Sequence, residues 1–218
     1  MTDSSGIRIK VCGLTRPEDV TAIAEAGADY AGFVFYEPSP RNIGLDVAAE
    51  LTRLVPDGIE KVALTVNAPD ALFEGLLDVA RVDLIQCHGN EGPQRLEELR
   101  DMFGLPVMKA ITIATEADLE ALPGYLESAD QLLIDAKGSA ADALPGGNGE
   151  SFDWSLLEGV EWDLPWMLAG GLTPDNVGEA IRVTGAGQVD VSSGVESARG
   201  IKDAGLIRAF CDAARAAG

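Results

Sequence analysis

Short apolar segments recur along this chain at an almost constant spacing. Eight runs of strand length begin roughly every 26 residues, at 7–13, 30–35, 61–66, 82–87, 106–111, 131–136, 165–170 and 188–193. The segments between them place apolar residues at the spacing of an amphipathic helix, over 17–27, 45–55, 69–80, 93–103, 115–126, 152–160, 173–185 and 203–217. The pattern therefore predicts eight strands that alternate with eight helices.

Such regular alternation predicts parallel strands that are joined by right-handed crossovers. Eight of these units can close into a (β/α)8 barrel, an α/β fold without an exposed sheet edge. An open doubly wound sheet is the alternative, but no G-x-G-x-x-G follows an early strand. We therefore expect a single (β/α)8 barrel domain over residues 1–218, in which Thr15 and Thr173 supply hydroxyl N-caps to the first and seventh helices.

One glycine-rich stretch, residues 137–150, is long enough to be a functional loop by its length alone. It follows the sixth strand, and the helical pattern resumes in phase at Phe152, so it is not a domain linker. In a barrel of this type, the loops that follow the strands gather at the C-terminal face, where active sites are built. Residues at the C-terminal ends of the strands are therefore the candidate site residues.

Glycines and hydroxyls follow the last two strands. The seventh strand ends at Gly170 and Gly171, and the eighth at Ser192, Ser193 and Gly194. In barrels, backbone N–H groups of the loops after strands seven and eight commonly bind a phosphate group. Tight turns use the same residue types, but two such turns at these two strands favour a phosphate site.

Asp135 and Cys12 are the candidates for proton transfer. Asp135 ends an apolar strand, where desolvation would raise its pKa and keep the carboxyl protonated as a general acid requires; a role in capping the following loop is the alternative. Cys12 ends the first strand just before a helix start, and a helix N-terminus nearby would favour a thiolate base. A strand cysteine can equally be a small buried apolar residue, which is what we expect of Cys87 and Cys211.

Two further polar residues follow strands two and four. Arg41 could bind a substrate carboxylate through two hydrogen bonds, or lie free in solvent. His88 belongs to the residue type whose free side chain titrates near neutrality, which suits catalysis, but it could instead hold its own loop through hydrogen bonds. The local sequence does not distinguish these roles.

Composition excludes several classes of protein. With 36 acidic and 16 basic residues the formal charge is −20, which repels nucleic acid and anionic membrane surfaces. The three cysteines and one histidine contain no C-x-x-C and no usual Cys/His metal set, and no nucleotide motif is present, so we expect no cofactor. No signal segment or membrane-length apolar run is found, which predicts a cytoplasmic protein. The acidity is either an ordinary solvated surface or an adaptation to high salt.

A phosphate site, a protonated acid, a thiolate base and no metal together suggest an isomerase that moves protons on a phosphorylated small molecule. The chain resembles the phosphoribosylanthranilate isomerase family of tryptophan biosynthesis along nearly all its length. The matching segments are KVCGLT (10–15), GADYAGFVFYEPSPR (27–41), QCHG (86–89), LLIDAK (132–137), PGGNGESFDW (145–154), LAGGLTPDNV (168–177) and VDVSSGVESARGIKD (189–203).

This resemblance implies a (β/α)8 barrel that carries out an Amadori rearrangement of N-(5-phosphoribosyl)anthranilate to 1-(o-carboxyphenylamino)-1-deoxyribulose 5-phosphate without a cofactor. It assigns Asp135 as the general acid and Cys12 as the general base. It also implies that Arg41 lies near the anthranilate carboxylate, and that the phosphate lies at the turns after strands seven and eight. We expect a monomer or a homodimer.

Three other barrels are alternatives. The histidine-pathway isomerase has aspartates at the ends of strands one and five, where this chain has Cys12 and Ile111. Indole-glycerol-phosphate synthase relies on lysine and glutamate in the barrel mouth; Lys10 and Lys109 are present here, but we expect no inward glutamate beside them. A non-catalytic phosphosugar-binding barrel would retain the phosphate turns alone.

Overall fold

Eight parallel strands form a closed barrel, which confirms the predicted fold. The computed structural model describes residues 6–136 and 154–218, and the strand order around the barrel follows the chain from β1 to β8. The strands are β1 (Arg8–Cys12), β2 (Tyr30–Phe35), β3 (Glu60–Thr65), β4 (Leu84–Cys87), β5 (Val107–Ile113), β6 (Gln131–Ala136), β7 (Trp166–Ala169) and β8 (Gln188–Val191). All eight overlap the apolar runs of the sequence.

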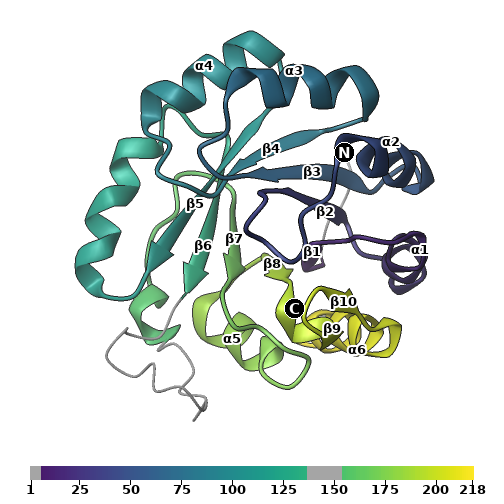
Figure 1. Ribbon diagram of the computed structural model, residues 1–218. Coiled ribbons are helices and arrows are strands. Elements are labelled where there is room, and N and C mark those ends of the chain that lie inside the picture. The colour runs from purple at the N-terminus through teal and green to yellow at the C-terminus, as the bar shows by residue number, and fades with distance from the viewer. Residues whose placement is uncertain (1–5, 137–153) are drawn as a thin grey trace.

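Helices surround the barrel, as Figure 1 shows. The α-helices are α1 (Pro17–Ala26), α2 (Leu45–Leu54), α3 (Asp70–Val79), α4 (Pro93–Phe103), α5 (Val177–Thr184) and α6 (Ala204–Arg215). The predicted fifth helix is instead a 3-10 helix, η1 (Glu116–Tyr125), which contains Pro123. A proline has no N–H to donate and disfavours an α-helix interior. Of the predicted sixth helix, the structure describes a short 3-10 helix, η3 (Trp154–Leu157); the glycine-rich segment 137–150 lies outside the described residues.

The two predicted threonine caps are wrong. The N-cap of α1 is Arg16, and the carboxylate of Asp19 accepts hydrogen bonds from the backbone N–H groups of Thr15 and Arg16, at 3.0 and 3.2 Å. In the seventh connection the chain first makes a turn, and α5 begins only after Asn176, whose side-chain oxygen accepts from the N–H of Thr173 at 2.7 Å. Longer side chains that reach back along the chain therefore cap both segments.

Side chains of the strands alternate between two cores. One buried cluster combines Tyr30, Val62, Leu84, Met108, Ala110, Leu133, Met167 and Ala169, the strand residues that face the barrel interior. The larger cluster lies between the outer face of the strands and the helices. Because strand side chains alternate with a period of two, Cys12, Asp135 and Ser192 are placed at the interior face near the strand ends.

The barrel closes through pairing of the first strand with the last. Four residues of β1 are in register with β8, from Arg8 opposite Gln188 to Val11 opposite Val191. After β8 the chain forms a 3-10 turn, η4 (Ser193–Val195), and a small antiparallel hairpin of β9 (Glu196–Ala198) and β10 (Ile201–Lys202), which the apolar pattern does not predict. No helix in the described part of the chain is long and apolar enough to cross a membrane.

Candidate active site

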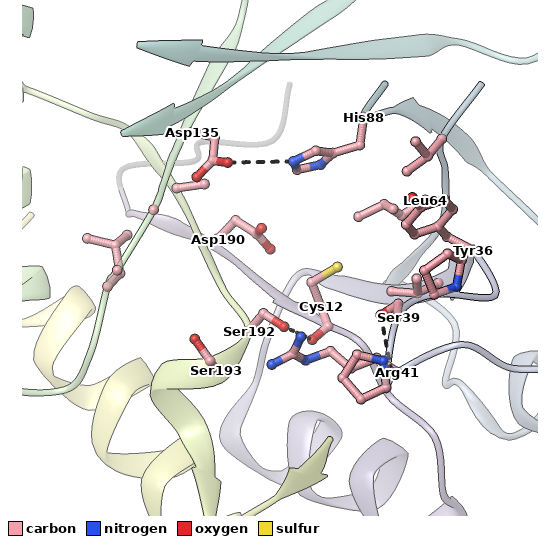
Figure 2. A pocket seen from close by; sticks show the side chains of 18 of the residues that line it. Cys12, Tyr36, Ser39, Arg41, Leu64, His88, Asp135, Asp190, Ser192 and Ser193 are labelled. Carbon is pink, nitrogen blue, oxygen red and sulfur yellow. Dashed lines mark hydrogen bonds and ion pairs between the residues drawn. The ribbon is translucent and has the colours of Figure 1, made fainter. Parts of the chain in front are cut away.

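A cavity of about 540 Å³ opens at the carboxyl ends of the strands. It is lined by residues from β1, β2, β3, β6, β7 and β8 and from loops that follow the strands, including His88 after β4 and Arg199 after β9 (Figure 2). The residues predicted from the sequence that line it are Cys12, Arg41, Asp135, Gly170, Gly171, Ser192 and Ser193. The fold thus gathers around one cavity residues that are up to 181 positions apart in the chain.

Cys12 is buried at the end of β1, with 3% of its surface exposed. Burial raises the pKa of its thiol above the ordinary 9.0; Lys10 and Lys202 act to lower it and Asp190 acts to raise it. The expectation that a helix N-terminus produces a resting thiolate is therefore wrong, because desolvation dominates and the carboxylate of Asp19 already binds the start of α1. Cys12 is a thiol at neutral pH, with buried cations near it.

Asp135 lies one residue before the end of β6, with 13% of its side chain exposed, and His88 faces it. The ring Nε2 of His88 is 3.7 Å from Oδ2 of Asp135, and its Nδ1 is 3.0 Å from the side-chain amide of Gln86. Gln86 is fully buried and therefore fixes the direction of the imidazole ring. Both roles considered for His88 remain open, since it is oriented by hydrogen bonds and also borders the cavity.

The turns after β7 and β8 require glycine at defined places. Gly170 has φ +93°, and a Cβ there would lie 2.0 Å from the carbonyl oxygen of Ala136; Gly171 has φ +64°. Gly194 does not line the cavity, but a Cβ on it would lie 1.9 Å from the carbonyl oxygen of Leu172. The turns after the two strands therefore pack directly on one another through their backbones, beside the hydroxyls of Ser192 and Ser193.

Arg41 does not lie free in solvent. Its Nε and Nη2 donate to the two carboxylate oxygens of Glu196 at 2.6 and 2.8 Å, and its side chain is 20% exposed. This hydrogen-bonded contact raises the pKa of Arg41. The alternative of a solvated arginine is thereby excluded, while its contact with a substrate remains a prediction.

Two charged groups near Cys12 were missed by the sequence reasoning as site residues. Lys10 is completely buried, and its Nζ donates to Oδ1 of Asp190 at 3.0 Å; Asp190 also lines the cavity, and lies between Asp135 and Cys12 in Figure 2. Glu196 and Lys202 form the second group, with Nζ to Oε1 at 2.9 Å. A charge within a buried strand, as in IRIKVC and QVDV, is the signal that could have identified the first pair.

Lys109 has a buried glutamate partner, but this glutamate is not an inward one, so it does not contradict the expectation of no inward glutamate beside Lys109. Nζ of Lys109 donates to Oε2 of Glu91 at 3.0 Å, and both side chains are buried. Lys109 alternates with the interior residues Met108 and Ala110, so it faces the helix layer. The pair therefore secures the loop after β4 and does not enter the cavity.

These features define a class: a (β/α)8 barrel with an open cavity at the C-terminal face that carries charged and hydroxyl side chains, which is where barrel enzymes carry their chemistry. The family model for N-(5'phosphoribosyl)anthranilate (PRA) isomerase matches residues 9–213. The chain therefore belongs to the N-(5'-phosphoribosyl)anthranilate isomerase family.

Relatives and solved structures agree with this assignment. The chain is 54% identical over 209 residues to N-(5'-phosphoribosyl)anthranilate isomerase of Paramagnetospirillum magneticum, covering 96% of this chain and 97% of the relative. The crystal structure of phosphoribosyl anthranilate isomerase from Thermotoga maritima superposes with a TM-score of 0.86 at 34% identity, covering 96% and 99% of the two chains. A phosphoribosyl anthranilate isomerase in complex with reduced 1-(o-carboxyphenylamino)-1-deoxyribulose 5-phosphate gives 0.84 at 32% identity, with the same coverage.

Proposed function

We propose that this chain isomerises N-(5-phosphoribosyl)anthranilate to 1-(o-carboxyphenylamino)-1-deoxyribulose 5-phosphate in tryptophan biosynthesis, with Asp135 as general acid and Cys12 as general base. The observation that carries the proposal is that an aspartate and a thiol border one cavity beside two glycine turns. Family membership supports the reaction. The single-domain organisation, the monomeric or dimeric state and the cytoplasmic location remain predictions from the sequence.

Asp135 would act first, by protonating the ring oxygen of the ribose. The C1–O bond then breaks, the anthranilate nitrogen supplies the electron pair, and an open-chain Schiff base forms. His88, 3.7 Å from the carboxylate and 30% exposed, lies where it can contact both Asp135 and solvent. A proton could return to Asp135 by this path after each turnover.

Cys12 would act second, by taking the proton from ribose C2 to leave an enolamine that tautomerises to the ketone. The thiol must first lose its own proton, which burial disfavours. Lys10, Lys202 and Arg41 interact electrostatically with Cys12. Among the described residues, the carboxylates that form ion pairs with these three cations are Asp190 and Glu196. One positive charge is thus left to balance a thiolate, so the reactive form is stabilised without being the resting form.

The phosphate would bind at the turns that contain Gly170, Gly171, Ser192, Ser193 and Gly194. Glycine at positions 170 and 194 lets the backbones of these turns approach neighbouring carbonyl groups closely, and glycine-rich turns of this kind can present backbone N–H groups to an anion. This contact fixes one end of the substrate and leaves the ribose between Asp135 and Cys12. Holding the reacting atoms in this way lowers the entropic part of the barrier.

Turnover of freshly prepared phosphoribosylanthranilate, followed by loss of its fluorescence, tests the proposal. We expect Cys12→Ala and Asp135→Asn each to lower kcat by about 10²- to 10⁴-fold with little change in KM, because each removes a proton transfer in the transition state. Cys87→Ala is the matched control, since this buried thiol ends β4 without lining the cavity. A wild-type rate in Asp135→Asn would exclude that residue as the acid, and a wild-type protein without turnover in dilute buffer and in molar salt would exclude the reaction.

A further inference from the structure

Glu196 lies outside the proton transfers, yet it makes the most extensive set of charged contacts near the cavity. Its carboxylate accepts two hydrogen bonds from Arg41, one from Nζ of Lys202 at 2.9 Å and one from the backbone N–H of Gly200 at 3.0 Å. Its side chain is 4% exposed and that of Lys202 is fully buried. A carboxylate with this many partners has a fixed position.

The hairpin that follows β8 provides this arrangement. Glu196 and Lys202 are opposite one another in the register of β9 and β10. The turn between them passes close to the loop after β2: a Cβ on Gly200 would lie only 2.8 Å from the carbonyl oxygen of Pro40. The hairpin therefore brings Glu196 beside Arg41, the residue that follows Pro40.

The path of the Arg41 side chain is also restricted along its length. The side chain packs against Gly13 so closely that a Cβ on Gly13 would lie 2.4 Å from Cδ of Arg41. The backbone N–H of Arg41 donates to Oγ of Ser39 at 3.1 Å. Gly13 follows Cys12 directly and has φ +84°. The aliphatic part of Arg41 thus passes over the chain beside the thiol, and the guanidinium ends against Glu196.

A guanidinium has two edges that can each bind a carboxylate through parallel hydrogen bonds. Glu196 takes the edge made of Nε and Nη2. The other edge, made of Nη1 and the second hydrogen of Nη2, binds no acceptor within residues 6–136 and 154–218, and Arg41 lines the cavity. The edge that remains is therefore the one available to a ligand.

Charge compensation lets Glu196 hold Arg41 without repelling a second carboxylate strongly. Burial alone would raise the pKa of Glu196, but hydrogen bonds from Arg41, Gly200 and Lys202 outweigh it and lower the pKa to about 2. Glu196 is thus ionised throughout the neutral range, and the ammonium of Lys202 offsets its charge. Together Arg41, Glu196 and Lys202 present one net positive charge.

We propose that Glu196 is a positioning residue, which fixes Arg41 so that the second edge of its guanidinium faces the anthranilate carboxylate of the substrate. The inference rests on the proposed function and extends it to the recognition of the ring carboxylate. It predicts that Glu196 determines how strongly the site prefers a ligand with this carboxylate over one without it.

Paired ligands test the proposal. One is reduced 1-(o-carboxyphenylamino)-1-deoxyribulose 5-phosphate, and the other is the same compound made with aniline, which lacks the carboxylate. Calorimetric titration gives the ratio of the two Kd values for each variant. We expect the wild type to prefer the carboxylate by about tenfold to a hundredfold, the range of a charged hydrogen-bonded contact, and Arg41→Met to lose this preference.

Two variants of Glu196 separate position from charge. Glu196→Asp keeps the charge but moves the carboxylate by one methylene, and Glu196→Gln keeps the length but removes the charge. We expect both to lose most of the preference, with little change in the Kd of the aniline compound. Combining Glu196→Gln with Arg41→Met should give the same ratio as Arg41→Met alone, because Glu196 acts through Arg41. Ser197→Ala, in the same hairpin but directed to Ile201, is the control.

The outcomes are distinct. An equal weakening of both ligands in the Glu196 variants would show a merely structural role and overturn the proposal, and so would an unchanged or increased preference in Glu196→Asp. A preference that survives Arg41→Met would place the carboxylate elsewhere and also overturn it. The proposed function is judged separately, by turnover of phosphoribosylanthranilate in the wild type. Thermal melts establish that each variant is folded.

Discussion

Replacing Lys10 with methionine tests how far the barrel depends on one buried charge pair. The Lys10 side chain is completely buried, and its Nζ lies 3.0 Å from Asp190, whose side chain is 9% exposed. Methionine has nearly the length of lysine but no charge, so Lys10→Met leaves the carboxylate of Asp190 without its cation. Breaking a buried pair in this way costs about 3–5 kcal/mol of the free energy of unfolding.

Urea unfolding, followed by fluorescence and circular dichroism, measures this cost at neutral pH. The double variant Lys10→Met, Asp190→Asn should recover a large part of it, since no uncompensated charge remains. Arg208→Met is the matched control, because Arg208 and Glu25 form a surface pair with side chains 64% and 63% exposed, for which we expect about 0–1 kcal/mol. A cost below about 1 kcal/mol for Lys10→Met would refute the reasoning, because it would show that Asp190 is solvated or neutral without Lys10.

Three further predictions follow from the site and the composition. In Asp135→Asn, residue 135 no longer has to be protonated, so the remaining pH dependence should come from Cys12. Because burial raises the pKa of Cys12 above the ordinary 9.0, kcat/KM should rise about tenfold per pH unit between pH 6 and 9. A plateau near pH 7 would contradict this. Gly194→Ala should cost about 2–3 kcal/mol in urea unfolding and raise KM, because its Cβ meets a backbone carbonyl. Gly171→Ala has open space around its Cβ and should cost only about 1 kcal/mol, so equal stability of the two variants would contradict the clash. The melting temperature should rise from dilute buffer to molar KCl, because salt screens the net charge of −20; an unchanged temperature would indicate an ordinary acidic surface.

The strands were predictable because a parallel barrel buries both of their faces. Each strand is therefore a short, nearly continuous apolar run, and all eight such runs coincide with strands. Helix starts were less predictable, since Asp19 and Asn176 cap their segments by reaching back over several residues, whereas Thr15 and Thr173 only resemble caps. The hairpin of β9 and β10 is too short and too polar to produce a periodic signal.

The polar contacts of the site could not be predicted from local sequence. Lys10 and Asp190 are 180 residues apart, and Arg41 and Glu196 are 155 apart. Only the closure of the barrel makes them neighbours. The protonation state of Cys12 was misjudged for a related reason: the position of the helix start is visible in the sequence, but the depth of burial that dominates the pKa is a property of the folded barrel.

The pairing of β1 with β8 has a consequence for the order of events during synthesis. β1 is made first, but the strand that covers its free edge ends at Val191, and the hairpin that supplies Glu196 follows it. Until that segment leaves the ribosome, β1 remains an unpaired edge and Lys10 has no counterion. A chain made only as far as β7 is therefore an open sheet with a free edge, a state that is prone to aggregation, and the site can assemble only after β8 and the hairpin have been made.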